Sequence, residues 1–300
     1  MITTGSNPKA MWPGINAWFG AAYKEHEPQW PELFDQHTSE MAWEEDVLVT
    51  GFGLAQVKPQ GQGITYEDEL QGFTARYTHV VYALGFIVSW EEQLNNLYEV
   101  VGKRRSQRLA FTMRQTKEWV CANIYNRAFD TNYVGGDGVC MCYASHPTSS
   151  GLQSNVPTTA VDISESGIED LMVMIGTAKN DKGHPIGLRA EKLIVPWQLW
   201  YEANRILQSV LQNDSALNAI NALKATGALP GGIKVNNYLT DPDNYFIRTN
   251  CPDGAKHFQR YPMTFGEDND FDTKNQKYAA LDYYSVGWSD WRTVYASQPS

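Results

Sequence analysis

Alternating and helical patterns of apolar residues divide the chain into strands and helices. Residues 47–57 and 73–88 suit β-strands, and the second segment begins with an alternation that places Phe73 and Tyr77 on one side. From 80 to 88 both sides are apolar, which predicts a buried base. The glycine-rich connection is too long for a tight hairpin turn. We therefore predict a two-stranded finger, and because a lone ribbon is marginal in water, its outer half should rest on another chain.

A long helical pattern follows the finger. Ser89 and Glu92 form a capping box that opens a helix, and apolar residues keep helical spacing to about residue 129. Gly102 is a candidate break or kink. A continuous helix of about 39 residues would be roughly 58 Å long, well beyond the average helix. The apolar positions are Leu94, Leu97, Tyr98, Val101, Leu109, Met113, Val120 and Ile124.

The first 46 residues predict an irregular arm. They contain the prolines Pro8, Pro13, Pro28 and Pro31, which oppose regular structure, together with large aromatic side chains. Such an arm gains stability only by docking, either on its own domain or on a neighbouring subunit.

The rest of the chain mixes helices and strands. Ser164 is expected to cap a helix, and Pro196 and Trp197 to start another, whose buried face would comprise Leu199, Ala203, Ile206, Leu207 and Val210. From Gly231 onward strands dominate, around 233–235, 245–248, 257–265, 278–286 and 293–296, and they are split by an acidic turn at 267–272. The predicted class is α+β with one long helix.

The composition describes a folded protein with an unusual surface. Of 300 residues, 42% are hydrophobic, which excludes intrinsic disorder, and the formal net charge is −10. This acidic balance argues against a general nucleic-acid binder, which needs clustered basic residues. Charged residues are 19% and aromatic residues 12% of the chain, a combination that favours extensive protein interfaces.

No segment is expected to target or anchor the chain. The start, MITTGSNPKAMW, lacks the basic and apolar regions of a secretory signal, so a reducing cytosol is the default. The longest apolar run, at 80–90, is well short of the roughly 20 residues that a membrane helix requires.

The nearest approach to a metal cluster is Cys140, Cys142 and His146. Zinc sites usually have four ligands, and the fourth would have to come from Cys121, Cys251 or a distant histidine. Small buried thiols beside a loop are the favoured alternative.

Asp268, Asp270 and Asp272 alternate as calcium ligands do at the start of an EF-hand loop. The pattern then fails, because Thr273 stands where glycine is needed and Ala279 where glutamate is needed. A solvated hairpin turn is the favoured interpretation, and calcium binding of another kind stays open.

Catalytic signatures are sparse. The chain contains neither a G-x-S-x-G nucleophile motif nor a phosphate-binding loop. The adjacent pairs Glu44-Glu45 and Glu91-Glu92, with many tryptophans, would suit a glycosidase, but Glu92 has a structural explanation in the helix cap.

The order of several short strings along the chain resembles that of a known family. These strings are Cys-Tyr-Ala-Ser-His-Pro at 142–147, a polar loop with Asn155, Asn-Asp-Lys-Gly at 180–183, Leu-Ile-Val-Pro at 193–196, Arg-Tyr-Pro at 260–262, Asp-Asn-Asp at 268–270, Thr-Lys-Asn at 273–275 and Trp291-Arg292. They resemble the major capsid proteins, or major head proteins, of tailed bacteriophages with the Hong Kong ninety-seven type fold, and most nearly the Mu-like major head subunit group.

This resemblance implies a division of the chain. It comprises an N-terminal arm at 1–46, an extended β finger (E-loop) at 47–88, a peripheral (P) domain with a long spine helix at 89–189, an axial (A) domain at 190–250, and C-terminal strands at 251–300 that return to the peripheral domain.

It also implies a function. The protein would be structural rather than enzymatic, and would self-assemble as hexamers and pentamers into an icosahedral head around packaged double-stranded DNA, without sequence-specific binding. An acidic chain is compatible with such a container, because a wall that bound DNA tightly would hinder packing and ejection. The resemblance implies no cofactor and no membrane partner, a place in the virion, and assembly in the host cytoplasm. Because there is no long coiled-coil N-terminal extension, a separate scaffolding protein is expected, together with the portal.

The arm and the finger are the expected sites of subunit contact. Some relatives also join subunits by a Lys–Asn isopeptide bond, for which Lys58 with Asn269 or Asn275 is of suitable type, although one finger lysine is expected by chance. The predicted contact residues are Trp12, Trp18, Trp30, Lys58, Gln60, Tyr66, Glu67, Asp68 and Glu69.

The rival hypothesis is a carbohydrate-active enzyme or carbohydrate-binding module that uses aromatic and carboxylate residues. A finger followed by an overlong helix distinguishes the two, because a compact enzyme has no use for it.

Overall fold

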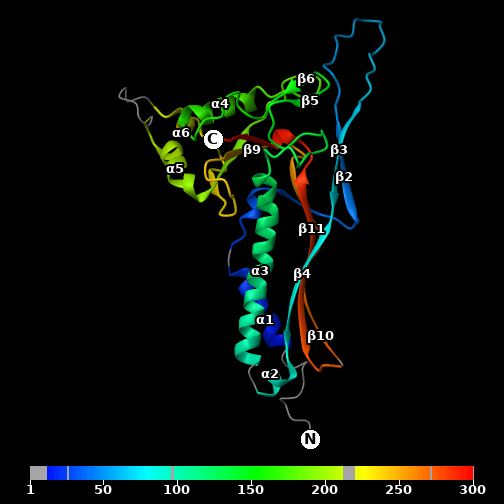
Figure 1. Cartoon of the computed structure of the whole chain (residues 1–300). Coiled ribbons are helices and arrows are strands. Elements are labelled where there is room, and N and C mark those ends of the chain that lie inside the picture. Colours follow the sequence, from blue (N-terminus) through cyan, green and yellow to red (C-terminus); the bar gives the residue numbers. More distant parts are fainter. Residues whose placement is uncertain (1–11, 26, 96–97, 212–219, 271, 300) are drawn as a thin grey trace.

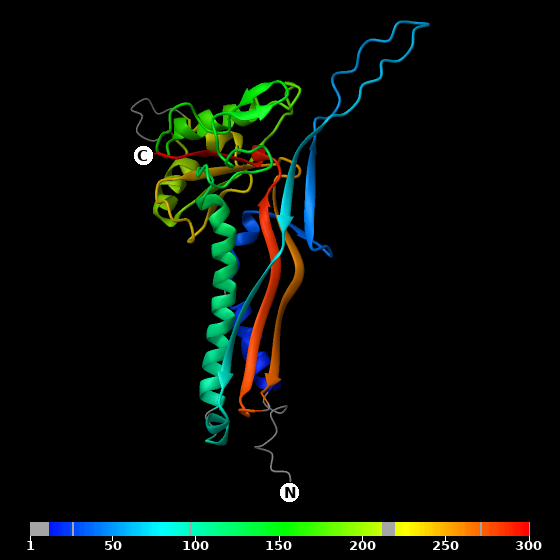
Figure 2. The same cartoon turned by 45° about the vertical axis from the view of Figure 1, so that its right-hand side comes forward.

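The computed structural model describes residues 12–25, 27–95, 98–211, 220–270 and 272–299. They form a long stem, a head at the upper end of the stem, and a finger that projects from the junction of the two (Figure 1). Turning the molecule shows that the finger points away from both other parts (Figure 2). The predicted α+β class is confirmed.

The stem consists of a long helix beside a four-stranded sheet in the order β1-β10-β11-β4. β10 and β11 are antiparallel and stay paired from Ala255 opposite Trp288 to Asn269 opposite Gln276. The strands predicted near 257–265 and 278–286 are therefore confirmed, and the acidic turn joins them. The elements are α3 (Tyr98–Asn126), β1 (Asp35–Thr38), β4 (Val80–Val88), β10 (Ala255–Asn269) and β11 (Gln276–Trp288).

The finger contains β2 (Trp43–Val49), β3 (Gln71–Thr78) and the connection between them. β3 and β4 follow each other along one extended run that changes partner at His79, because β3 pairs with β2 whereas β4 pairs with β11. The first finger strand begins and ends earlier than the predicted 47–57.

The prediction that the base of the finger is buried was wrong. β4 is the outer strand of the stem sheet, so among the described residues one of its edges has no neighbouring strand, and Val88 is its one buried residue. Val80, Val81, Leu84 and Ile87 are each about half exposed.

The prediction of an irregular arm was wrong for part of its length. Residues Trp12–Lys24 form helix α1, in which Pro13 occupies the first turn, where the missing N–H needs no partner. Ile15, Phe19 and Ala22 recur at helical spacing and are buried in the stem. The arm therefore docks on its own subunit, one of the two possibilities left open by the sequence.

The spine helix is confirmed as two helices, α2 (Trp90–Leu94) and α3, on either side of Asn96 and Leu97, which lie outside the described residues. The capping box forms as predicted, with Ser89 N donating to Glu92 Oε2 and Glu92 N donating to Ser89 Oγ. α3 has 29 residues and is about 44 Å long. It does not break at Gly102, where Ile15 of the arm packs closely against the helix.

The head is built on a second four-stranded sheet in the order β12-β9-β7-β8. Ser164 caps α4 by accepting a hydrogen bond from Gly167 N, as predicted. A short 3-10 helix begins at Trp197 and leads into α5, but α5 ends at Gln208, so Val210, predicted to be buried, is 68% exposed. The elements are β7 (Ala190–Val195), β8 (Ile233–Val235), β9 (Tyr245–Thr249), β12 (Val294–Ser297), α4 (Glu165–Gly176), α5 (Trp200–Gln208), α6 (Ala222–Thr226) and the hairpin β5 (His146–Thr148)–β6 (Gly151–Gln153).

An apolar joint connects the head, the stem and the arm. Tyr125 from α3 packs edge-to-face against Phe34 of the arm and Phe246 of β9, and Tyr125 Oη donates a hydrogen bond to Leu33 O. The head core itself combines residues from 163–178, 188–206, 245–251 and 291–295. The sequence-derived boundaries at 189/190 and 250/251 therefore run through this core.

A buried carboxylate fastens the arm to α3. Glu118 accepts hydrogen bonds from the backbone N–H groups of Gln29 (2.8 Å) and Trp30 (2.9 Å), at the start of a 3-10 helix over Trp30–Glu32. Burial raises the pKa of Glu118. Beside it, Lys117 Nζ lies over the Trp30 ring and donates to Gln259 Oε1.

His257 gives the stem a pH dependence. It is fully enclosed, with the Trp30 ring centroid at 4.2 Å, and burial together with the Lys117 charge lowers its pKa to about 3. The unfolded chain binds this proton below about pH 6.5, so the stability contributed by the neutral ring is complete above that pH and is lost as the pH falls toward 3.

We expect His257→Phe to flatten this dependence. The difference in unfolding free energy between variant and wild-type subunits should change by about 2 kcal/mol between pH 7 and pH 5, at 1.36 kcal/mol per pKa unit. Denaturant unfolding at the two pH values measures it. Parallel pH curves for the two proteins would contradict the assignment.

Candidate assembly surfaces

The outer half of the finger has little support from its own chain. Thr50 N donates to Leu70 O at the end of the β2–β3 ladder, and beyond this point the described backbone forms no strand pairing. Every residue from 54 to 71 is exposed. The exposed apolar side chains of the finger are Trp43, Val47, Val49, Phe52, Leu54, Val57, Ile64, Tyr66, Leu70 and Phe73.

The predicted contact residues of the finger fall in two groups. Lys58, Gln60, Tyr66, Asp68 and Glu69 are all exposed, Lys58 and Gln60 near the tip and Asp68 and Glu69 close to the end of the β2–β3 ladder. Glu67 instead accepts hydrogen bonds from Lys182 Nζ (2.6 Å) and Gly53 N (2.7 Å), which lower its pKa. Glu67 thus connects the two sides of the finger and links them to the head.

The predicted contact residues of the arm pack within the subunit. Trp18 is half-buried beside Ile15, Val88 and Tyr278, and Trp30 is half-buried against the joint and His257. The side chain of Trp12 lies outside the described residues. Whether Trp18 and Trp30 also touch another subunit stays a prediction.

A network of polar side chains holds the root of the finger. Asp46 of β2 pairs with Lys256 of β10 (2.7 Å) and accepts a hydrogen bond from Ser289 Oγ (2.6 Å). The hydroxyl of Tyr77 on β3 lies 2.6 Å from the same Ser289 oxygen. Both finger strands are therefore bonded to the stem at one place, which sets where the finger leaves the body.

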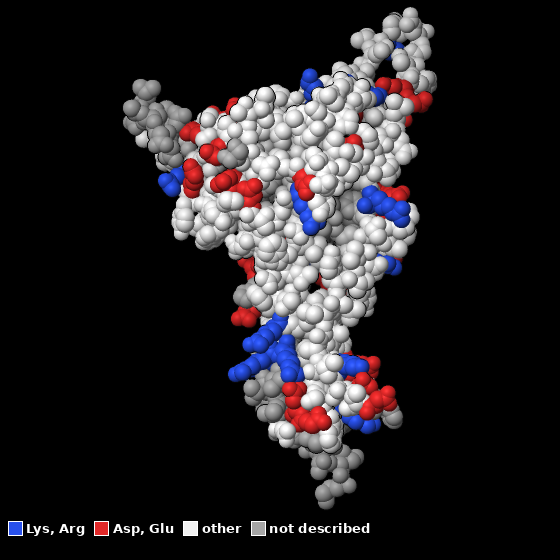
Figure 3. Space-filling view, viewed as in Figure 1, with Lys and Arg blue, Asp and Glu red and all other residues white. Residues whose placement is uncertain are grey.

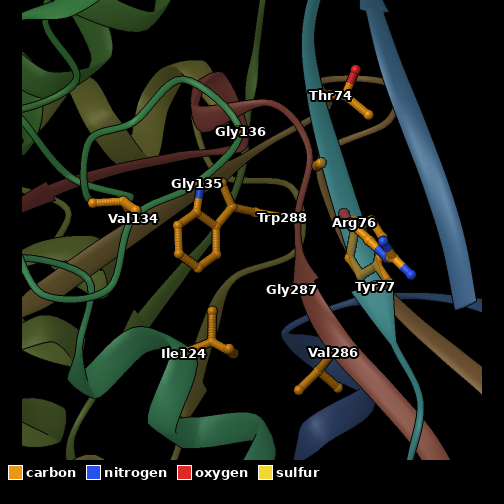
Figure 4. Close-up of a pocket in the computed structure, with 11 residues that line it drawn as sticks. Thr74, Arg76, Tyr77, Ile124, Val134, Gly135, Gly136, Val286, Gly287 and Trp288 are labelled. Atoms are coloured by element: carbon orange, nitrogen blue, oxygen red, sulfur yellow. The ribbon is translucent and has the colours of Figure 1, made fainter.

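A glycine-containing loop packs against the same root. Gly135 and Gly136 lie between β3 and Trp288, beside a cavity of about 250 Å³ that Ile124 and Val286 also line (Figure 4). A Cβ on Gly136 would lie 2.8 Å from Thr74 O, and one on Gly135 would lie 2.7 Å from the indole nitrogen of Trp288. Only glycine allows this close approach, a use of the loop that the sequence reasoning missed.

Further apolar surface lies on the head and on the stem edge. The stacked rings of Trp197 and Trp200 stand beside Tyr201, and both Trp197 and Tyr201 are more than half exposed. The space-filling view shows an area without charged side chains in the middle of the head, with several acidic groups toward its left-hand end (Figure 3). The exposed apolar side chains of the head, of β4 and of the finger are suited to protein contact.

The Cys-His motif is a structural network rather than a metal site. His146 lies fully buried between Asp137 Oδ2 (2.7 Å from Nδ1) and Asn155 Oδ1 (3.2 Å from Nε2), and its ring stacks on Trp291. All four cysteines are free and buried, and burial raises the pKa of the Cys142 thiol well above its usual value.

The acidic group Asp268, Asp270 and Asp272, the second metal candidate, lies at a hairpin turn. Asp270 pairs with Lys277 Nζ at 2.8 Å in the turn between β10 and β11, as expected for a solvated hairpin. In the part of the chain that the structure describes, no group of three or more His, Cys, Asp or Glu residues is arranged to hold a metal ion. None of the described helices has the length and apolar character needed to cross a membrane.

Asn155 ties the polar loop to the C-terminal segment. Its side-chain amide donates to the carbonyls of Met141 (2.7 Å), Val294 (2.9 Å) and Trp291 (3.3 Å), while its oxygen accepts from Tyr143 N. Nearby, buried Arg292 pairs with Asp181 and Asp290. The strings at 142–147, 155, 180–183 and 291–292 therefore meet in one region of the head. Those at 260–262, 268–270 and 273–275 lie instead in β10 or in the turn between β10 and β11 of the stem.

Comparison with known proteins decides what these surfaces belong to. A model of a family described as phage capsid protein matches residues 72–297. The chain belongs to the phage capsid protein family. None of the curated proteins matches the capsid protein in sequence.

Solved structures share the fold at low sequence identity. The capsid protein is similar to a virus-like particle from Pyrococcus furiosus (TM-score 0.56, 11% identity, 96% of this chain and 99% of that chain). It is also similar to a structure from Mycobacterium phage Patience (TM-score 0.53, 13% identity, 99% and 88%) and to the capsid of Cyanophage P-SCSP1u (TM-score 0.54, 10% identity, 87% and 85%).

These findings confirm a structural major capsid protein of the phage head and the Hong Kong ninety-seven type fold. The narrower grouping with Mu-like heads stays a prediction. The carbohydrate-active alternative has no support, and one carboxylate of each candidate pair has a structural role, since Glu44 accepts a hydrogen bond from Ser39 Oγ and Glu92 pairs with Arg105.

Adding a methyl group at Gly136 should destabilise the capsid protein. We expect Gly136→Ala to lower the unfolding free energy by about 1–3 kcal/mol, because the new Cβ meets the backbone of β3. Gly176→Ala is the matched control, since its Cβ would have no atom within 4 Å. Chemical denaturation of unassembled subunits measures both, and equal effects would contradict the close-packing argument.

Removing the Asn155 amide should lower the unfolding free energy more than Gly136→Ala does. Asn155→Ala leaves several buried backbone groups without partners, so we expect a loss of about 2–4 kcal/mol in unfolding free energy. Asn155→Asp keeps the shape but turns an oxygen toward three carbonyls, and should destabilise at least as much. An Asp variant of wild-type stability, judged by thermal unfolding, would show that the donor bonds are unimportant.

Proposed function

We propose that this capsid protein assembles as hexamers and pentamers in which the finger of each subunit lies across an adjacent subunit. The observation that carries the proposal is the exposed apolar finger. Its outer half bears side chains such as Val57 (93% exposed) and Tyr66 (89% exposed), for which the described part of its own subunit offers no cover. Burial of such side chains against a neighbour stabilises the assembly, and repetition around a closed shell multiplies the effect.

The stem, head and finger have separate roles in this proposed assembly. In our proposal the stem acts as the peripheral domain, the head as the axial domain, and the finger root as the fixed point between them. Because the head core includes 163–178 and 291–295, both segments are assigned to the axial domain, in place of the assignment made from the sequence. Exposed Trp197 and Tyr201 then become candidates for contact between neighbouring heads.

The shell would enclose packaged double-stranded DNA without sequence-specific binding, and would assemble in the host cytoplasm with a separate scaffolding protein and the portal. The net charge of −10 supports enclosure without tight binding. Expression of this chain alone tests the need for a scaffold, because closed and uniform shells in electron micrographs would remove that part of the proposal.

The apolar finger contact is tested by Val57→Ser combined with Tyr66→Ser. We expect folded subunits that no longer assemble, or that need at least tenfold more protein to do so, because apolar burial between subunits is lost. Val173→Ser is the matched control, since Val173 is 64% exposed but belongs to α4 of the head rather than to the finger. Sedimentation and electron microscopy give the readout, and wild-type assembly of the double variant would refute the finger contact.

A further inference from the structure

Three basic side chains lie together on the lower half of α3. Lys103, Arg104 and Arg108 are all exposed, and a group of basic atoms marks this part of the stem (Figure 3). None of them has an ion-pair partner among the side chains that the structure describes, whereas Arg105 beside them pairs with Glu92 at 2.9 Å. Residues four apart share one side of a helix, so Arg104 and Arg108 present adjacent charges.

The finger carries the opposite charge. Between residues 50 and 70 its ionisable side chains are Lys58, Glu67, Asp68 and Glu69, together with Tyr66. Glu67 is occupied by Lys182, but Asp68 and Glu69 are exposed, and no described side chain forms an ion pair with them. Two acidic residues and a basic group, all without ion-pair partners among the described side chains, therefore occur on the same chain.

These two groups cannot meet within one subunit. The finger leaves the body at the junction of stem and head and points away from both, whereas residues 103–108 lie in the lower half of the stem (Figure 1). Contact between them requires a second copy of the chain.

We propose that Asp68 and Glu69 of one copy form ion pairs with Arg104 and Arg108 on α3 of a second copy. Lys103 adds to the positive field, although its Nζ also lies 5.8 Å from the Trp18 ring centroid. The proposal rests on the proposed function, in which the finger lies across a neighbouring subunit, and it names the surface on which the finger lands. Apolar contact holds the finger without fixing its position, and opposite charges supply the register.

Phosphate groups of DNA are the other possible partner for the basic group. The acidic finger favours a second copy, because it provides two unpaired carboxylates for the two arginines, on a segment that already needs a neighbour. A nucleic-acid role is therefore treated as an outcome of the test.

Charge reversal separates these cases. We expect Arg104→Glu with Arg108→Glu to raise the subunit concentration needed for assembly about tenfold, and Asp68→Lys with Glu69→Lys to do the same, because like charges then face each other. All four substitutions together should restore assembly to within about threefold of wild type. Arg189→Glu, at an exposed arginine of the head, is the matched control for added negative charge. Thermal unfolding of each unassembled variant verifies that it folds.

Two results would overturn the proposal: wild-type assembly of the Arg104/Arg108 variant, or a fourfold variant no better than its parents. If the arginine variant assembles normally and loses only DNA content or affinity for duplex DNA, the basic group is a nucleic-acid surface instead. Failure of the charge exchange while the Val57/Tyr66 variant still blocks assembly would leave the proposed function standing and remove only this inference.

Discussion

The packing of aromatic side chains at the upper end of α3 is the interaction on which the rest of the structure depends. Tyr125 contacts Phe34 from the arm and Phe246 from the head sheet, and Met141 and Val294 are buried in the same cluster. Each such side chain contributes about 1.5–3 kcal/mol when fully buried. Because segments far apart in sequence meet here, loss of this joint would separate the head, arm and stem together.

The finger is fixed to the body by a separate set of contacts at its root. The Asp46–Lys256 pair and the Tyr77–Ser289 contact bond both finger strands to the stem, and the loop at Gly135 and Gly136 packs tightly beside them. The finger therefore has a defined origin but an unsupported outer half. A structural protein gains from this combination, since the stability that the outer half lacks becomes available only when neighbours cover it.

The polar residues in the strings that resemble the family stabilise the fold. Asn155 and Arg292 satisfy buried carbonyls and carboxylates around the C-terminal segment. Such groups are costly to bury without partners, so each arrangement specifies one path for loops that have little regular structure. Hydrogen bonding also explains why the two cysteines near a histidine do not form a metal site. Both ring nitrogens of His146 already have partners, Asp137 and Asn155.

The sequence by itself determined the elements whose signals are local. Capping at Ser89 and Ser164, the presence of a long spine helix, the C-terminal strands and the exposure of the outer half of the finger all follow from residue type and spacing, and the order of short strings indicated the family. Only the tertiary structure decided where those elements lie. It showed that the proline-rich arm forms a helix over Gly102, that β4 leaves the finger to become a stem edge, and that distant segments share the head core. Contacts of this kind depend on long-range packing, which local spacing does not encode.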